Sequence, residues 1–248
     1  MIHASTARPR RGSTLPATDR YNRAMPTPRD HSVLFLGKAD DEYTARALAT
    51  TKATFGRVES FLGRWGDPWP KEARDWSGDW VISYLSRWVV PNDLLKQARI
   101  AAINFHPGPP EYPGVGCTNF AIYDGAREYG VTCHHMTASI DSGRIVAVQR
   151  FPVDDGETLY ELHCRTQEHL IELFESLMRD LVAGKPLPES EEAWARPAYT
   201  RQEFEALRRI DPTMPEEEIA RRVRATRFPN MPGAYLELAG HRFEVQTT

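Results

Sequence analysis

Several features that define common protein classes are missing from this sequence. Its three cysteines, Cys117, Cys133 and Cys164, form no CxxC pair, which argues against a disulfide framework or zinc site and makes a reducing cytoplasm the expected compartment. No apolar run is long enough to span a bilayer, so we expect no membrane partner. The net charge of −3 gives no general attraction to nucleic acid. Gly37 ends an apolar run without the GxGxxG pattern, which argues against a dinucleotide cofactor.

The first thirty residues are also poor in apolar side chains. Residues 1–30 contain six arginines with many Ser, Thr and Pro residues, and they lack the apolar core of a secretory signal. An arginine-rich start is compatible with a transit peptide, but the prolines disfavour the amphipathic helix that such a peptide needs. We therefore predict a disordered extension over residues 1–30, with Met25 as an alternative natural start.

Beyond this segment, short apolar runs alternate with helical patterns. Residues 32–37, 80–85 and 99–105 are typical of buried strands, and residues 57–61 fit either a strand or a helix. Residues 40–51 predict a helix capped by Asp40 or Asp41, and Pro91 suits the first turn of another. The alternation predicts an α/β fold, with a mostly parallel, twisted sheet flanked by helices, over a main domain of residues 31–200.

The carboxyl-terminal part has a different pattern. Residues 166–182 predict an amphipathic helix that packs on the main domain. Residues 212–226 predict a further helix, whose acidic start and basic end suit the helix dipole. A Pro- and Gly-rich turn then leads into a hairpin that ends near residue 245. We assign residues 201–248 to a small subdomain made of a helix and a hairpin.

The candidate site begins where the apolar run of residues 99–105 ends. A strand would place Asn104 and His106 on one face, because side chains alternate along it, and a loop rich in Pro and Gly follows directly. In parallel sheets, ligands bind beyond the carboxyl ends of the strands. An amide can donate to a developing oxyanion, and an imidazole can exchange a proton near neutral pH. These residues therefore favour chemistry on a carbonyl group.

Asp141 is a third candidate, on a turn that Gly143 terminates. A carboxylate there could orient an imidazole and hold a water molecule, although a lone Asp-Ser-Gly turn is most often structural. His134 and His135 are adjacent, so on a strand they point to opposite faces and cannot readily share a metal ion. We interpret both as structural, with one of them near the substrate as an option, and predict no metal site.

Four short segments, taken in order, carry a resemblance to a known family. They are Asn-Phe-His-Pro at 104–107, Tyr-Pro-Gly at 112–114, Tyr-Gly-Val-Thr at 129–132 and Ile-Asp-Ser-Gly at 140–143. Together they resemble the formyltransferases that use 10-formyltetrahydrofolate, strongly over residues 79–153 and weakly elsewhere. The resemblance implies that Asn104, His106 and Asp141 are the catalytic residues and that residues 31–200 form the catalytic domain.

The same resemblance implies where the two substrates bind. The pterin of 10-formyltetrahydrofolate would lie between the loop after the third strand and the loop carrying the aspartate. The residues expected to contact this cosubstrate are Ser83, Tyr84, Leu85, Trp88, Val90, Thr137, Ile140 and Asp141. The acceptor is expected to contact Pro107, Gly108, Tyr112 and Gly114. Tyr112, Trp88 and Tyr235 are candidates for stacking on its base or sugar.

The identity of the acceptor is open among the relatives. The short carboxyl-terminal ending and the Gly-Pro-Pro-Glu loop at 108–111 differ from the methionyl-tRNA and glycinamide ribonucleotide enzymes, so we favour a GDP- or dTDP-linked amino sugar such as a perosamine. That acceptor implies a cytoplasmic role in lipopolysaccharide O-antigen biosynthesis. A methionyl-tRNA or glycinamide ribonucleotide formyltransferase, a 10-formyltetrahydrofolate hydrolase and a non-enzymatic folate-binding protein remain alternatives. The oligomeric state is open, with a homodimer as one option.

Overall fold

The computed structural model describes residues 27–245, so most of the predicted disordered extension lies outside the described residues. The elements in chain order are η2 (Pro28–Asp30), β1 (Ser32–Lys38), α1 (Glu42–Thr54), β2 (Arg57–Gly63), η3 (Lys71–Ala73), β3 (Gly78–Tyr84), α2 (Asn92–Leu95), β4 (Ala98–His106), α3 (Cys117–Asp124), β5 (Glu128–His135), β6 (Ile145–Pro152), α4 (Leu159–Val182), α5 (Arg201–Arg208), α6 (Glu216–Thr226), β7 (Tyr235–Leu238) and β8 (His241–Glu244).

A six-stranded sheet in the order β2-β1-β3-β4-β5-β6 forms the centre of the molecule. Strands β2, β1, β3 and β4 run parallel, and β5 and β6 extend the sheet with antiparallel pairing. The ambiguous segment at 57–61 lies in a strand, with Arg57 paired to Ser32. The sheet is mostly parallel and flanked by helices, which confirms the predicted fold class.

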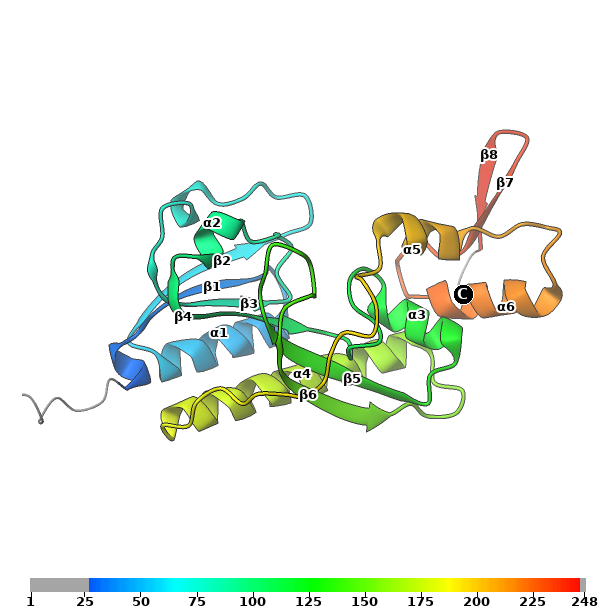
Figure 1. Ribbon diagram of the computed structural model, residues 1–248. Coiled ribbons are helices and arrows are strands. Elements are labelled where there is room, and N and C mark those ends of the chain that lie inside the picture. The colour runs from blue at the N-terminus through cyan, green and yellow to red at the C-terminus, as the bar shows by residue number, and fades with distance from the viewer. Residues whose placement is uncertain (1–26, 246–248) are drawn as a thin grey trace, which may run out of the picture.

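The two faces of the sheet are covered by different helices, α1 and α4 on one face and α2 on the other (Figure 1). Alternate strand residues such as Ile82 and Phe105 point toward α1 and α4, where Phe174 of α4 packs with them. The residues between them, such as Val81, point to the opposite face and pack with Leu94 of α2. Both faces are apolar, as a parallel sheet requires.

The helix starts differ from those predicted from sequence. Helix α4 begins at Leu159 rather than at 166, because Thr158 and Glu161 form a capping box that satisfies the first backbone amides. Helix α6 begins at Glu216 rather than at 212, directly after Pro215. Helix α5 was not predicted. It is short, and a capping box between Thr200 and Glu203 marks its start.

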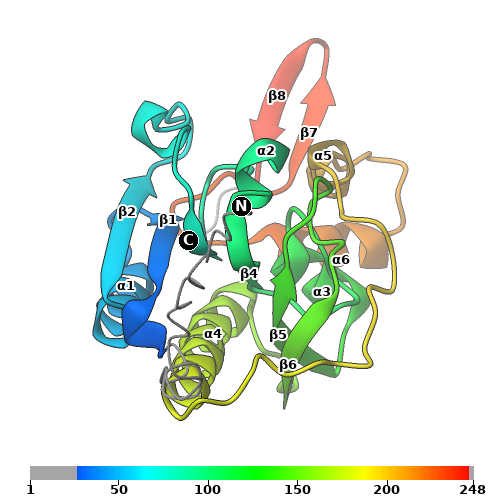
Figure 2. The ribbon, with the colours of Figure 1, turned by 60° about the vertical axis from the view of Figure 1, so that its left-hand side comes forward.

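The carboxyl-terminal elements lie against α3 at one end of the sheet (Figure 1). The side chain of Asn119 donates to the carbonyl oxygen of Ala225 at 2.8 Å, and the hydroxyl of Tyr123 donates to Glu218 at 2.9 Å. The β7–β8 hairpin projects away from the rest of the molecule (Figure 2). Across residues 27–245, no helix is long and apolar enough to cross a membrane.

Candidate active site

Asn104 and His106 lie at the carboxyl end of β4, at the edge where ligands bind to parallel sheets. Ile103 and Phe105, which alternate with them, belong to the core under α1 and α4. Asn104 and His106 therefore share the opposite face, the one that α2 covers. The local placement predicted from the sequence is the placement that the structure shows.

His106 is buried, and both of its ring nitrogens face hydrogen-bond acceptors. Its Nδ1 lies 3.2 Å from Oδ2 of Asp141, and its Nε2 lies 3.0 Å from the carbonyl oxygen of Tyr112. In the imidazolium form both nitrogens donate, which matches these two acceptors. The contacts fix the orientation of the ring beside the sheet edge.

Asp141 divides its two carboxylate oxygens between two histidines. Oδ2 lies 3.2 Å from His106 and accepts the backbone N–H of Gly114 at 2.8 Å, while Oδ1 lies 3.2 Å from Nε2 of His134. Its φ of 41° lies in the left-handed region, which is uncommon for a residue other than glycine. Such strained residues persist where surrounding contacts hold them, often at functional sites.

The pKa of Asp141 results from opposing effects. Burial by itself raises the pKa of this carboxyl group. The charge of a protonated His106, the hydrogen bond with His134 and the Gly114 amide outweigh burial, so the pKa stays below its usual range. Asp141 is therefore an anion at neutral pH and provides a fixed negative charge between the two imidazoles.

His134 connects Asn104 to the His106–Asp141 pair. It lies directly opposite Asn104 in the antiparallel pairing of β4 and β5, with its Nε2 3.1 Å from Nδ2 of Asn104. Its Nδ1 donates to the carbonyl oxygen of His135 at 2.9 Å. The sequence interpretation treats His134 and His135 as structural, with one of them near the substrate as an option, and the structure brings His134 into the cluster. Only the pairing of β4 with β5 reveals this, and no local sequence pattern encodes that pairing.

Trp194 is a second member of the site that the sequence interpretation missed. Its ring centroid lies 5.8 Å from that of His106 and 5.1 Å from that of His134, edge-on in both cases. It comes from the irregular segment between α4 and α5, where no periodic pattern or motif draws attention to it. We refer to His106, His134, Asp141 and Asn104 as the catalytic cluster, because the sequence resemblance implies a catalytic role for Asn104, His106 and Asp141, and Trp194 packs against this cluster.

The residues predicted to contact the cosubstrate at the end of β3 face opposite sides of the sheet. Ser83 is paired with Asn104 in the register of β3 and β4, and its buried side chain shares the face of the cluster. Tyr84 points to the other face, where its ring packs against Phe105 and Phe174. Tyr84 can therefore contact a ligand at the cluster only through its backbone.

The next three predicted residues lie in the loop after β3. Leu85 has a φ of 52°, again in the left-handed region. The indole N–H of Trp88 lies 3.0 Å from the carbonyl oxygens of both Asp67 and Pro68, so its polar atom is already used by the protein. Val90 is buried in the core under α2. These contacts shape the loop, and Leu85 is its conformationally unusual residue.

Thr137 and Ile140 lie in the connection between β5 and β6. The hydroxyl of Thr137 is 2.7 Å from that of Ser142 and donates to the carbonyl oxygen of Ser139 at 3.1 Å, which folds the connection on itself. Ile140, one residue before Asp141, has 53% of its surface exposed. The connection therefore presents an apolar side chain to solvent beside the catalytic cluster.

The loop predicted to contact the acceptor is tied firmly to β5. The carbonyl oxygen of Pro107 accepts the Tyr129 hydroxyl at 3.0 Å, and that of Gly108 accepts the Thr132 hydroxyl at 2.7 Å. Tyr112 contributes its carbonyl oxygen to His106, and its ring packs beside that of Tyr129. These hydrogen bonds hold the loop against β5 and His106.

Tyr235, named from the sequence as a possible stacking residue, is the first residue of β7. Its ring is buried, with the guanidinium groups of Arg208 and Arg242 lying over it at 5.6 and 3.6 Å. Its surface is therefore occupied by these two arginines, and it is not available for stacking on an acceptor.

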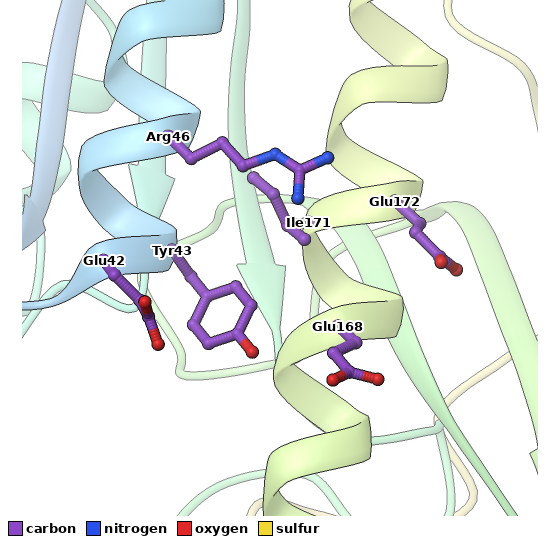
Figure 3. Close-up of a pocket in the computed structure, with 6 residues that line it drawn as sticks. All are labelled: Glu42, Tyr43, Arg46, Glu168, Ile171 and Glu172. Carbon is purple, nitrogen blue, oxygen red and sulfur yellow. The ribbon is translucent and has the colours of Figure 1, made fainter.

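A hollow of about 450 Å³ lies between α1 and α4, on the face of the sheet away from the catalytic cluster. Figure 3 shows Tyr43 and Arg46 of α1 on one side of it and Glu168 of α4 on the other, while Glu172 points away from α1. Arg46 is held by Glu175 through contacts of 2.6 and 2.7 Å. Within residues 27–245, no three or more His, Cys, Asp or Glu side chains are grouped so that they could hold a metal ion.

Comparison with known sequences places this geometry in context. Residues 72–176 match the sequence model of the formyl transferase family. Over 169 residues the chain is 30% identical to the GDP-perosamine N-formyltransferase of Brucella melitensis. The match covers 67% of this chain and 64% of the relative, so the chain spans less than two thirds of that relative's length.

Solved structures share the fold. A sugar N-formyltransferase from Shewanella superimposes with a TM-score of 0.69 at 19% identity, covering 88% of this chain and 97% of that one. The N-formyltransferase from Helicobacter canadensis, in complex with folinic acid and dTDP-3-aminofucose, gives a TM-score of 0.63 at 18% identity and 84% coverage of both chains. Residues 72–176 therefore carry a formyl transferase domain, the chain resembles a GDP-perosamine N-formyltransferase in sequence, and it shares the fold of a sugar N-formyltransferase.

Proposed function

We propose that this protein transfers a formyl group from 10-formyltetrahydrofolate to the amine of a nucleotide-linked amino sugar. The observation that carries the proposal is the catalytic cluster, in which Asn104 and His106 stand together at the carboxyl edge of the sheet and Asp141 contacts His106 at 3.2 Å. Amide, imidazole and carboxylate groups in this arrangement are suited to acyl transfer without a covalent enzyme intermediate.

The chemistry required of the protein is modest. When bound, the cosubstrate supplies a formyl group that is already activated on a folate nitrogen. Asn104 and His106 would donate hydrogen bonds to the negative charge that develops on the formyl oxygen, and each such donor contributes about 2.7–4 kcal/mol to lowering a barrier of this kind. Asp141 would hold His106 in orientation and stabilise its positive charge.

The residues around the cluster fit a folate. Leu85 and Asp141 have φ values of 52° and 41°, and they lie in the two loops between which the pterin is expected. Val89 and Ile140, in the same two loops, expose 66% and 53% of their surfaces. Exposed apolar side chains of this kind suit contact with a flat heteroaromatic ring, while backbone groups of strained loops can reach its polar edge.

The choice of acceptor rests on the relatives. The curated relative is a GDP-perosamine N-formyltransferase, and the structure from Helicobacter canadensis was solved with dTDP-3-aminofucose. We infer that the acceptor here is of the same class, a small molecule that belongs to the synthesis of a surface polysaccharide such as an O-antigen. A cytoplasmic location and a homodimer remain predictions from the sequence.

Mass spectrometry tests the acceptor directly. The protein is incubated with 10-formyltetrahydrofolate and, in separate reactions, GDP-perosamine, dTDP-linked amino sugars, initiator methionyl-tRNA and glycinamide ribonucleotide. A mass increase of one formyl group on an amino-sugar nucleotide is the expected result, and the Asn104→Ala variant serves as the inactive control. Faster formylation of the tRNA or of glycinamide ribonucleotide would reject the sugar acceptor. Formate release without any acceptor would indicate a hydrolase instead.

A further inference from the structure

The segment between α4 and α5 crosses β5 and β6 on its way to the carboxyl-terminal subdomain (Figures 1 and 2). Four backbone hydrogen bonds fasten residues 190–199, which we call the strap. In one of them the N–H of Val115 donates to the carbonyl oxygen of Tyr199 at 3.0 Å. The N–H groups of Ser190, Ala195 and Tyr199 donate to the carbonyl oxygens of Ile145, Pro110 and Pro113 at 3.3, 3.0 and 2.8 Å, respectively. The strap is therefore attached to the loop after β4 and to the start of β6.

Trp194 lies in the middle of the strap and contacts both halves of the catalytic cluster. Its indole N–H donates to the carbonyl oxygen of Gly143 at 2.8 Å, two residues beyond Asp141. The next residue, Ala195, bonds to the loop that follows His106. Consecutive strap residues thus link the loop that carries the carboxylate to the loop that follows the imidazole.

The ring of Trp194 also restricts the two histidines. It meets His106 at an interplanar angle of 73° and His134 at 87°, with centroid separations of 5.8 and 5.1 Å. An imidazole can rotate about its χ2 torsion unless its surroundings prevent it. An indole packed edge-on against both rings restricts that rotation.

We propose that Trp194 is a positioning residue, which holds His106 and His134 against Asp141 in the geometry that formyl transfer requires. The proposal rests on the proposed function for its kinetic consequences, but its structural part concerns only the imidazoles. Trp194 acts through the histidines and through Gly143. Misplacement of reacting groups by about 1 Å can lower a rate by about 100-fold, so a positioning contact of this kind has a large kinetic effect.

Two substitutions separate the roles of the indole. Trp194→Ala removes both the packing and the N–H donor, and kcat is expected to fall by about 100-fold with KM for both substrates little changed. Trp194→Phe keeps an aromatic ring but loses the donor to Gly143, so an intermediate loss of kcat is expected. Glu191→Ala, an exposed strap residue, is the matched control and should retain wild-type kcat.

A second readout does not depend on the acceptor. Side-chain ¹H–¹⁵N spectra report which imidazole nitrogens carry protons, and the His106 and His134 signals should change in Trp194→Ala while those of His31 and His241 stay in place. Unchanged kcat together with unchanged imidazole signals would overturn the proposal. A raised acceptor KM with unchanged kcat would also overturn it and would make Trp194 a wall of the acceptor site. If Trp194→Ala does not fold, the same two measurements on Trp194→Phe decide the matter.

Discussion

At the scale of single residues, Asp141 is the point at which the contacts of the site converge. It is only 8% exposed and receives contacts from His106, His134 and the Gly114 amide. Its pKa in the folded protein is lowered, so the carboxylate stabilises the fold above the pKa that it has in the unfolded chain. That stabilisation is lost as the pH falls through the folded-state pKa.

The Asp141→Asn substitution tests this linkage. At neutral pH the variant should melt well below the wild type, because it lacks the charge that pairs with the imidazoles. The difference in Tm should hold down to about pH 4, near the ordinary pKa of an aspartate, and shrink at lower pH. Thermal melts between pH 7 and pH 3 measure it, with Asp155→Asn, an exposed carboxylate, as the control. A difference in Tm that does not vary with pH would contradict the linkage.

The members of the catalytic cluster are expected to act as a unit. Asn104→Ala should lower kcat/KM by about 100- to 1000-fold, the range found when one stabilising donor is removed from such a site. Asp141→Asn should lower it to a similar extent, because it removes the carboxylate that orients His106. The kcat/KM of the double variant should be close to that of the more damaging single variant, because residues that act together do not contribute additively once one of them is removed. Steady-state kinetics on variants with wild-type circular dichroism would show this. Fully additive losses would mean that the two residues act independently.

The sequence predicts some of these residues and not others, for a physical reason. Asn104 and His106 are two positions apart, so strand alternation alone places them on one face, and the Asp-Ser-Gly turn indicates where Asp141 lies. His134 and Trp194 join the cluster through the pairing of β4 with β5 and the path of the strap. Those are long-range contacts that no local pattern specifies.

At the scale of secondary-structure elements, the start of α4 and the short helix α5 were not predicted by the apolar pattern. The apolar stripe of α4 indicates a helix, but its first turn is set by Thr158 and Glu161, which lie outside the strongly apolar part. The same Thr-x-x-Glu spacing at Thr200 and Glu203 marks α5, whose eight residues are too few for a clear amphipathic pattern. Capping boxes are therefore the local pattern by which both starts could have been found.

The connection between β5 and β6 depends on Gly143. A Cβ atom at this position would lie 1.8 Å from the carbonyl oxygen of His135, so Gly143→Ala requires the backbone to move. Because Gly143 also accepts the Trp194 N–H and lies two residues from Asp141, we expect both a lowered Tm and a large loss of kcat. Gly184→Ala is the control. It has a positive φ of 77° but nothing within 4 Å, so it should cost about 1–2 kcal/mol of stability without affecting kcat. Equal activity of the two variants would contradict the expectation.

At the scale of the whole molecule, charged residues of α6 have a role beyond the helix dipole. The acidic start and basic end were interpreted from the sequence as a match to that dipole. In the structure, Glu218 accepts a hydrogen bond from the hydroxyl of Tyr123 in α3. The Nε of Arg221 donates to the backbone carbonyl oxygen of Tyr123 at 2.8 Å. Charges that look like a local pattern therefore also hold α6 against α3, which is a contact between distant parts of the chain.

The amino-terminal boundary of the fold gives the last prediction. The sequence predicts that residues 1–30 lie outside the fold, yet η2 (Pro28–Asp30) is part of the described structure. Its capping residue Thr27 bonds to Asp30 through its N–H at 2.8 Å, and a Cβ atom at Gly56 would lie only 2.0 Å from the carbonyl oxygen of Arg29. This close packing joins η2 to the start of β2, at the end of the sheet away from the catalytic cluster.

Removal of residues 1–26 should therefore leave both Tm and kcat/KM unchanged, since that segment has few apolar side chains with which to pack. Removal of residues 1–30 should lower Tm by a few degrees, because the packing of η2 against Gly56 is lost, and kcat/KM should stay the same. Thermal melts and steady-state kinetics on the two truncated variants distinguish the boundaries. A lower Tm after removal of residues 1–26 would show that residues before Thr27 contribute to the fold. Equal Tm values for the two truncated variants would show that the fold begins after residue 30, as the sequence predicts.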